Sequence, residues 1–311
     1  MKPNSSLSSL FTVSVLSLVV AFFTPNVKAQ EGYIVVERHS KRVLLASNSE
    51  KEVSTGSFSQ LATAKIVLDW AKLSGTPLTT MMVVPHGVAE SGLRNVLNIQ
   101  TGDQLSMRDA LYTMSLNQDS ASALVLGDFV GRQVLARKGK GGSGYTAFIK
   151  EMNNLAGFLN MRSTSFKSPA GGVGKTKISD LAKLASYALK TNSYDFYMKQ
   201  KTRLVNVHRA ATGAKESFKI TNSNSLLNTM SVGGLMVEGS NAVVSANKQN
   251  VVKKLADGRA QITPRQLVVV GFDAPNRDER MKQLIKSGWE IYEGWRQQGF
   301  PRTEKGKEFL K

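Results

Sequence analysis

A serine that opens an apolar helix is the first place in this sequence where chemistry could occur. Ser57 follows the polar loop Ser54–Gly56, and Leu61–Trp70 continues as an apolar helical segment. At a helix N-terminus the free backbone N–H groups and the helix dipole stabilise developing negative charge, which suits a serine nucleophile in acyl transfer. One turn later stands Gln60. An amide accepts no proton near neutral pH, so the usual activation of a serine is absent, and an ordinary N-cap role for Ser57 stays open.

Two other patterns that suggest chemistry fail on spacing. Gly171–Thr176 resembles a phosphate-binding loop, but Pro169 stands where the pattern requires its first glycine, so we expect no nucleotide. The three histidines, His39, His86 and His208, have no carboxylate or cysteine at metal-ligand spacing. This spacing argues against a zinc site, and no cofactor is expected.

The elements that must position these residues run from strands through helices and back to strands. A strand–turn–strand pattern at both ends of the chain predicts an α/β fold with an antiparallel sheet built from both ends. The expected strands are Tyr33–Glu37, Arg42–Ala46, Gly233–Val244 and Gln266–Asp273. The expected helices, after the one at Ser57, are Ser106–Ser115 with a capping box, Asp119–Val130, Tyr145–Leu159, Ser179–Leu189 and a closing helix capped by Asn276 and Glu279.

The closing helix carries an apolar stripe at helical spacing. The stripe consists of Met281, Leu284, Ile285, Gly288, Tyr292 and Trp295. We interpret it as core packing rather than as a membrane contact.

Residues 1–29 are expected to be a secretory signal. Lys2 precedes the apolar run Leu10–Phe23, and Val27-Lys28-Ala29 provides a small-residue cleavage site. The apolar run is shorter than the roughly 20 residues that a membrane span needs, so we expect cleavage after Ala29, with an uncleaved anchor as the alternative.

The charge balance is strongly basic. Forty-one Lys and Arg residues face 23 Asp and Glu residues, a net charge of +18, and there is no cysteine. No basic motif interleaved with aromatics is present, so we expect no nucleic acid partner. For an exported protein, at a periplasmic or cell-envelope location, the charge indicates attraction to anionic envelope polymers.

From Gly32 to Trp295 the chain resembles the low-molecular-weight penicillin-binding proteins of the D-alanyl-D-alanine carboxypeptidase type, peptidase family S11. An ordered series of segments carries the resemblance in addition to the segment around Ser57. The series comprises Met107–Tyr112, Phe148–Asn153, Met161–Phe166, Ser168–Gly172, Ser179–Ala185 and Asn222–Leu227. The resemblance implies the serine β-lactamase and penicillin-binding-protein fold, an antiparallel sheet flanked by helices with a helical subdomain.

The resemblance also implies roles for the site residues. Ser57 takes the place of the nucleophile, and Gln60 replaces the lysine that serves as general base. Ser115 and Asn117 match the serine and asparagine of the second motif after a one-residue shift. The unshifted register puts Leu116 and Gln118 there instead.

The third motif departs from the family pattern as well. Met236 stands where a lysine would bind the substrate carboxylate, followed by Val237 and by Glu238, whose charge repels such a carboxylate. We expect these residues and Ser57 to converge around one cleft despite their altered chemistry.

We therefore expect an exported D-Ala-D-Ala carboxypeptidase-like protein of peptidoglycan metabolism that is catalytically degenerate and binds peptidoglycan or its stem peptides. The alternative is an active carboxypeptidase that trims stem peptides through acyl-Ser57. A substitute base such as Lys65 lies about 12 Å from Ser57 along the helix, which argues against that rescue. The expected division is a signal at 1–29, the peptidase-like domain at 30–297 and a tail at 298–311, without the family's additional C-terminal β domain.

Overall fold

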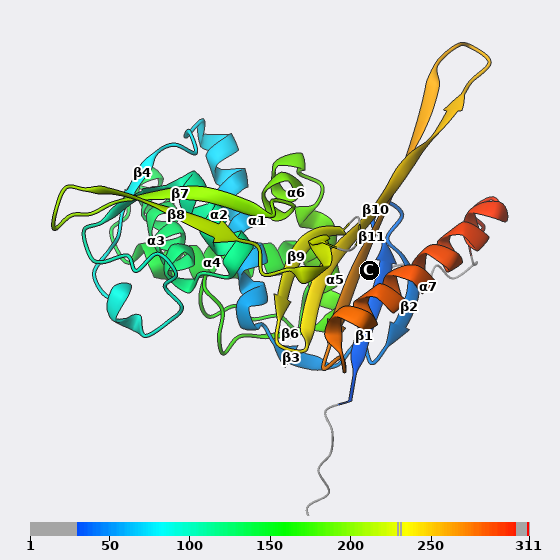
Figure 1. Ribbon diagram of the computed structural model, residues 1–311, viewed down its shortest axis with the longest axis horizontal. Coiled ribbons are helices and arrows are strands. Elements are labelled where there is room, and N and C mark those ends of the chain that lie inside the picture. Colours follow the sequence, from blue (N-terminus) through cyan, green and yellow to red (C-terminus); the bar gives the residue numbers. More distant parts are fainter. Residues whose placement is uncertain (1–29, 229, 231, 303–309, 311) are drawn as a thin grey trace, which may run out of the picture. The chain divides into compact units, whose positions relative to one another are not determined.

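Strands from both ends of the chain pair in one antiparallel sheet, as predicted. The computed structural model describes residues 30–228, 230, 232–302 and 310, with the backbone alone for Asn192 and residues 233–237. Within this part the sheet has five strands in the order β2-β1-β11-β10-β9 (Figure 1). They are β1 (Gly32–Glu37), β2 (Arg42–Ser47), β9 (Val232–Glu238), β10 (Asn241–Lys254) and β11 (Ala260–Phe272).

Both faces of this sheet are buried, and the alternation of side chains explains how. In β1, Ile34 and Val36 pack into the larger core, which includes the helices, whereas Val35 packs into a smaller core on α7 (Arg277–Gln297). The same alternation places Val268 and Val270 of β11 in the larger core. Because successive strand residues point to opposite faces, runs of valine suit a sheet covered on both sides.

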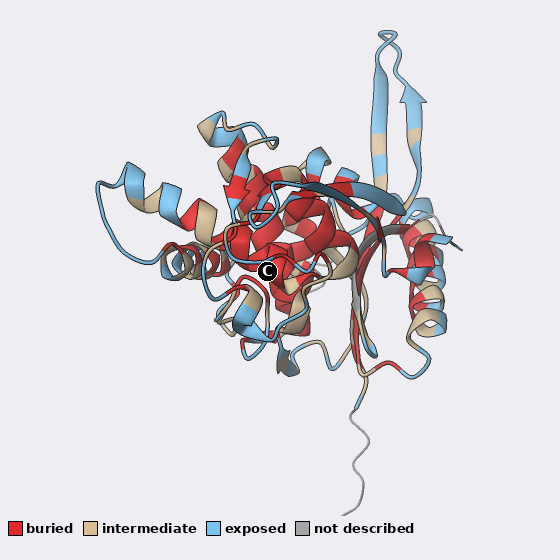
Figure 2. Ribbon diagram, turned by 60° about the vertical axis from the view of Figure 1, so that its left-hand side comes forward, coloured by how far each residue is buried: buried red, intermediate tan, exposed pale blue. Residues whose placement is uncertain are grey.

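A group of helices with many buried residues covers one face of the sheet (Figure 2). The observed bounds of α1 to α5 differ from the predicted ones by a few residues, except that α3 continues seven residues beyond the predicted end at Val130, and α6 was not predicted. The helices are α1 (Ser59–Ser74), α2 (Met107–Asn117), α3 (Ser120–Arg137), α4 (Gly144–Phe158), α5 (Ile178–Ala188) and α6 (Asn192–Met198). Ser106 caps α2 as predicted, since its hydroxyl accepts the amide of Asp109 at 3.0 Å.

The closing helix α7 covers the other face. The predicted stripe is buried, with Trp289 beside it, which confirms the interpretation as core packing. The predicted cap at its start is wrong. Asn276 has a left-handed backbone with φ +47° and its side chain makes no capping hydrogen bond.

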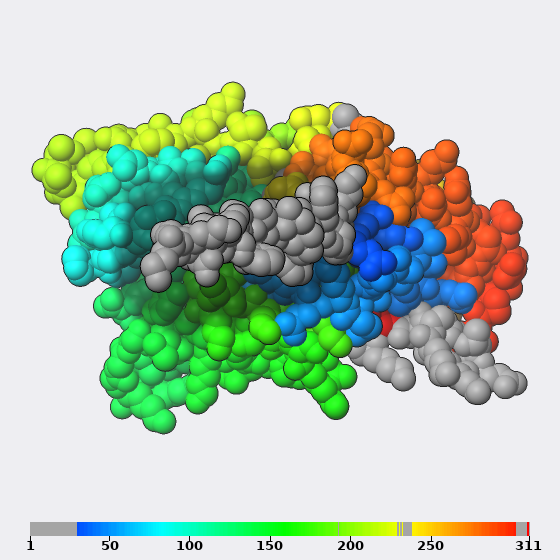
Figure 3. Space-filling model, turned by 90° about the horizontal axis from the view of Figure 1, so that it is seen from below, coloured from blue at the N-terminus to red at the C-terminus, as the bar shows by residue number. Residues whose placement is uncertain are grey.

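A second sheet was not predicted from the sequence. Short strands β4 (Met81–Val83) and β5 (Gln104–Ser106) pair with the hairpin β7 (Thr202–His208) and β8 (Lys215–Thr221), in the order β4-β5-β7-β8. The hairpin, in yellow-green, and α7, in orange to red, lie at opposite ends of the body (Figure 3). A third small sheet pairs β3 (Glu52–Ser54) with β6 (Lys175–Lys177).

The far halves of β10 and β11 project from the body as a two-stranded hairpin (Figures 1 and 2). Residues 248–254 and 260–263 are mostly exposed, whereas the near halves are buried. A bulge between Lys248 and Val251 marks where the hairpin leaves the sheet.

Glu31–Lys311 groups as one compact unit, separate from Met1–Gln30. The signal predicted at 1–29 lies outside the described residues. Among the helices of the described part, none has the length and apolar character needed to cross a membrane.

Candidate functional site

Ser57 lies in a single 3₁₀ turn, Gly56–Phe58, that runs directly into α1. Gly56 has φ +44°, a left-handed conformation that glycine adopts at low cost. A Cβ at position 56 would lie 2.5 Å from Oε2 of Glu238. Glycine at this position therefore allows the end of β9 to approach the serine closely.

The carboxylate of Glu238 binds both functional atoms of Ser57. The backbone N–H of Ser57 donates to Oε2 at 2.9 Å, and the Ser57 hydroxyl donates to Oε1 at 3.2 Å. In serine acyl transfer the hydroxyl is the nucleophile, and backbone N–H groups nearby stabilise the oxyanion that develops. Glu238 thus occupies two positions that a substrate would need.

Gln60 is buried one turn further along α1 and acts only as a donor. Its side-chain nitrogen donates to the carbonyl oxygens of Ala170 at 3.1 Å and Gln118 at 3.3 Å. These bonds join α1 to the loop after α4 and to the end of α2. The amide holds the site together and supplies no proton acceptor to Ser57.

The predicted second-motif residues, Ser115 and Asn117, both lie in the last turn of α2, but their side chains have different surroundings. Ser115 is buried inside the last turn, whereas Asn117 faces outward and donates to the carbonyl of Thr221 at 3.1 Å. Arg94 also holds Asn117, through its backbone carbonyl at 2.8 Å and its side-chain oxygen. The residue that contacts Gln60 is Gln118, through its carbonyl oxygen.

Gln118 adopts a left-handed conformation, φ +56°, and ends α2. Its side chain donates to the hydroxyl of Ser223 at 3.1 Å, and Ser223 donates its backbone N–H to Leu116 at 2.7 Å. The next residue, Asp119, caps α3 by accepting the amide of Ser122 at 2.7 Å. Burial raises the pKa of Asp119, although the hydrogen bonds it accepts oppose that shift.

The third-motif strand is β9, which runs beside the Ser57 turn. Met236 pairs with Val243 and Val237 with Ala242 across the edge of the sheet. The side chains of Met236 and Val237 lie outside the described part. A bulge between Val243 and Val244 separates this pairing from the first part of the strand.

Several buried polar atoms around Ser57 have no hydrogen-bond partner among the described residues. They are the hydroxyls of Thr55, Ser59 and Ser115 and Oε1 of Gln60. Buried polar groups are nearly always paired in folded proteins, and exceptions gather at functional sites. Four such atoms therefore lie at or near the start of α1.

Lys65 does not serve Ser57. Its ammonium forms an ion pair with Asp69 and lies 4.7 Å from the centre of the Tyr187 ring. Lys65 is almost fully buried in this position. The geometry agrees with the helical spacing, which argued against Lys65 as a substitute base.

Sequence reasoning did not assign a site role to the loop Ser168–Gly174. A Cβ at Gly171 would lie 2.1 Å from the carbonyl oxygen of Gly56, so this loop packs on the backbone of the Ser57 turn. Thr55 donates its amide to Gly174 at 2.9 Å. The three closely spaced glycines of this loop first suggested a phosphate loop. They were the sequence feature that could have indicated close packing on the Ser57 turn.

The comparisons with known proteins concern the family and the fold. The sequence matches the model of the D-alanyl-D-alanine carboxypeptidase family, peptidase family S11, over residues 19–257. The chain belongs to this family.

Two curated relatives are a carboxypeptidase and an endopeptidase. The D-alanyl-D-alanine carboxypeptidase of Streptomyces sp. strain K15 is 25% identical over 212 residues, 67% of this chain and 70% of the relative. The D-alanyl-D-alanine endopeptidase of Pseudomonas aeruginosa is 31% identical over 140 residues, 44% of this chain and 40% of the relative.

Solved structures confirm the fold class. The Streptomyces K15 DD-transpeptidase superposes with a TM-score of 0.68 at 21% identity, covering 83% of this chain and 96% of that one. Penicillin-binding protein 6B from Escherichia coli gives a TM-score of 0.64 at 20% identity, covering 85% and 78%. The predicted penicillin-binding-protein fold is therefore correct.

Proposed function

We propose that this chain is an exported member of the D-Ala-D-Ala carboxypeptidase family that binds peptidoglycan stem peptides in the cell envelope without efficient turnover. The observation that carries the proposal is the carboxylate of Glu238 on both the amide and the hydroxyl of Ser57. The family and its relatives supply the substrate class.

Loss of the base supports low activity. General base assistance contributes about 10²–10⁴ in rate, and Gln60 offers none because an amide accepts no proton near neutral pH. Its amide nitrogen instead donates to two carbonyls. The oxyanion position adds a second loss. Removal of one oxyanion donor costs about 10²–10³ in rate, and the Ser57 amide is engaged by a negative charge.

The negative charge of Glu238 also affects which peptides can bind near Ser57. A peptide that ends in D-Ala-D-Ala carries a carboxylate, and Glu238 repels it where the family pattern has no acidic residue. A stem peptide whose end is amidated or cross-linked avoids this repulsion. We infer that ligands without a free terminal carboxylate bind more tightly.

One observation favours a second candidate, an active carboxypeptidase that works through acyl-Ser57. Oε1 of Glu238 accepts the Ser57 hydroxyl at 3.2 Å, which is within reach of a general base. Under this alternative the carboxylate takes the serine proton during acylation. The same oxygen would then activate the water that releases the product.

Two substitutions separate the candidates. Wild type, Ser57→Ala, Glu238→Gln and Glu238→Gly are assayed for labelling by fluorescent penicillin and for release of D-alanine from a D-Ala-D-Ala peptide. If Glu238 blocks the serine, wild type releases no D-alanine and Glu238→Gly labels faster than wild type. If Glu238 is a base, wild type turns over at about 1 s⁻¹ or faster, and both Glu238 variants lose that activity.

Export has its own test. Expression of the full chain in a Gram-negative host, followed by N-terminal sequencing of the envelope fraction, should give a protein that begins at Gln30. A protein that keeps Met1 and stays with the membrane would instead support an uncleaved anchor.

A further inference from the structure

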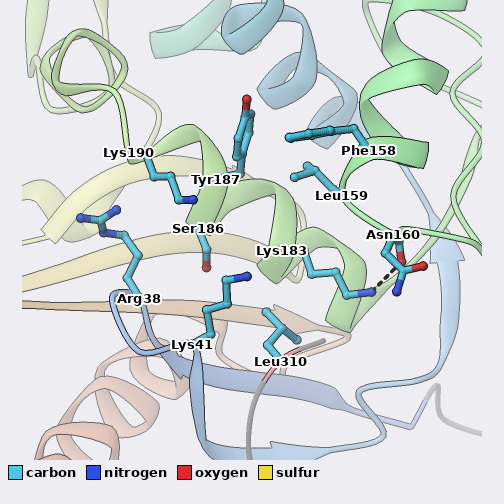
Figure 4. Close-up of a pocket in the computed structure, with 10 residues that line it drawn as sticks. All are labelled: Arg38, Lys41, Phe158, Leu159, Asn160, Lys183, Ser186, Tyr187, Lys190 and Leu310. Atoms are coloured by element: carbon cyan, nitrogen blue, oxygen red, sulfur yellow. Dashed lines mark hydrogen bonds between the residues drawn. The ribbon is translucent and has the colours of Figure 1, made fainter.

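A cavity lined by positive charge lies away from Ser57 (Figure 4). Its volume is about 300 Å³, and it is enclosed by the turn between β1 and β2, the end of α4 with the residues that follow it, and α5. Among the described residues its cations are Arg38, Lys41, Lys183 and Lys190, and no lining side chain is a carboxylate. It shares no lining residue with the Ser57 site.

Carboxylates among the described residues compensate the positive charge of this pocket only in part. Lys183 pairs with Asp180 at 2.7 Å, but the other three cations form no ion pair with any described residue. Arg38 contacts the ring of His39 at 3.2 Å, and its buried Nε has no partner within the described chain. Burial lowers the pKa of Arg38, while the carboxylates of Glu37 and Asp195 offset part of this shift.

A buried hydroxyl also faces the pocket without a partner. Ser186 is 6% exposed, and its Oγ makes no hydrogen bond to the described residues. Figure 4 shows this oxygen directed toward the side that Arg38 and Lys41 occupy. A buried hydroxyl and a buried guanidinium nitrogen, both unpaired beside one cavity, indicate a missing acceptor that binds there.

The remaining wall is apolar. Phe158, which is largely exposed, meets the ring of Tyr187 edge-on at 5.7 Å between centroids, and Leu159 is half-buried. Leu310 closes one side, where its amide donates to the carbonyl of Lys41 at 2.8 Å. The pocket thus combines a cationic side with an aromatic and aliphatic side.

We propose that this pocket binds a small molecule that carries a phosphate group, with the phosphate between Arg38, Lys41 and Lys190 and the organic part against Tyr187. A phosphate offers several acceptor oxygens and close to two negative charges, which matches a guanidinium, two ammonium groups and a hydroxyl better than a single carboxylate does. The volume lies at the lower end for ligand pockets, so it suits one sugar-sized group rather than a polymer.

The same phosphate chemistry could come from a free sugar phosphate or from a lipid head group. The test measures binding of inorganic phosphate, glucose and glucose 1-phosphate to residues 30–311 by calorimetry, and of phosphatidylglycerol vesicles by co-sedimentation. We expect glucose 1-phosphate to bind and glucose not to bind. Binding by the vesicles alone would identify the lipid source and still support the pocket if the variants below abolish it.

Substitutions of the lining residues test whether any measured binding occurs in this pocket. The pair Lys41→Gln with Lys190→Gln should weaken phosphate binding about tenfold or more. The matched control, Lys140→Gln with Lys150→Gln, removes the same charge from exposed positions outside the pocket and should leave binding nearly unchanged. Ser186→Ala should weaken binding severalfold without altering the circular dichroism spectrum.

Two results would overturn the proposal. One is the absence of binding by every phosphate probe at millimolar concentration. The other is an equal loss in the pocket pair and the control pair, since that would show attraction to net charge rather than a site.

Discussion

At Ser57 the neighbouring side chains decide what the serine can do. The sequence placed Ser57 at the start of a helix and Gln60 one turn later, because both features are local. The hydrogen bond from Ser57 to Glu238 could not be predicted from the sequence, because these residues are 181 positions apart and meet only through the register of β9. Sequence reasoning expected Glu238 to repel a substrate, whereas the structure places its carboxylate on the serine itself.

The first prediction restores the missing lysines at two positions and removes the carboxylate at a third. Gln60→Lys alone should leave D-alanine release poor, because Glu238 still holds the amide and hydroxyl of Ser57. Adding Met236→Lys and Glu238→Gly should raise kcat/KM by more than the product of the separate effects, since residues that act as one unit are non-additive. Steady-state assays on the three single variants and on the triple variant measure this.

The control for this series is the triple variant that also carries Ser57→Ala, which should be inactive. Equal activity in the triple variant and in Gln60→Lys alone would contradict the role we give to Glu238.

Among the elements, the strands that alternate and the helices with clear apolar faces were predictable. Sequence reasoning missed β7 and β8 because only Val205, Val207 and Ile220 of these strands are fully buried, which leaves a weak pattern. It misread Asn276 as a side-chain cap because residue type suggests a cap but does not fix the backbone conformation. The two registers of the second motif also remained open, since the turn at Gln118 depends on its left-handed backbone.

The second prediction concerns the projecting part of β10 and β11. Replacing residues 249–264 by Asn-Gly joins the facing pair Lys248 and Arg265 through a two-residue turn. The thermal midpoint of residues 30–311 should change by no more than about 3 °C, because the removed residues are mostly exposed. Differential scanning calorimetry measures the change.

A matched comparison uses the other hairpin. Ile220→Ala removes a side chain that is 2% exposed, and should lower the free energy of unfolding by about 2–4 kcal/mol. Destabilisation by the hairpin replacement as large as this would show that the projecting strands support the core.

The third prediction uses the ion pair between Arg209 and Asp103, which links the β7–β8 hairpin to the loop before β5. Burial opposes ionisation of Asp103, but the amides of Gln100 and Ala210 and the guanidinium of Arg209 outweigh it and lower its pKa. This stabilisation is present above the unfolded pKa near 4 and is lost as pH falls through the folded pKa.

Asp103→Asn should therefore reduce the free energy of unfolding at pH 7 by about 2 kcal/mol, and by less at pH 3. Urea denaturation at both pH values measures this. The control is Asp257→Asn at the exposed hairpin turn, which should leave stability unchanged. A deficit in Asp103→Asn that stays constant across pH would contradict the linkage.

On the scale of the whole molecule, attraction by the net charge extends over a longer distance than binding at the Ser57 site. A net charge of +18 attracts the chain to any anionic polymer, and salt screens that attraction over about 10 Å at 0.1 M. Salt screens interactions at partly buried charges less, and Ser57 and Glu238 are both half-buried. Binding to the cell envelope should therefore have one part that depends strongly on salt and another that depends weakly on it.

The last prediction separates these parts with purified peptidoglycan sacculi. Residues 30–311 should co-sediment with sacculi at 50 mM NaCl, and raising the salt to 500 mM should release most of the protein. The fraction that remains should be displaced by a soluble stem peptide ending in D-Ala-D-Ala amide, and less readily by the free acid, because Glu238 repels a terminal carboxylate. Glu238→Gln should remove this difference between the two peptides while leaving the salt-sensitive fraction intact. Complete release by salt, with no effect of either peptide, would show that surface charge alone holds this protein on the wall and that the Ser57 region binds no stem peptide.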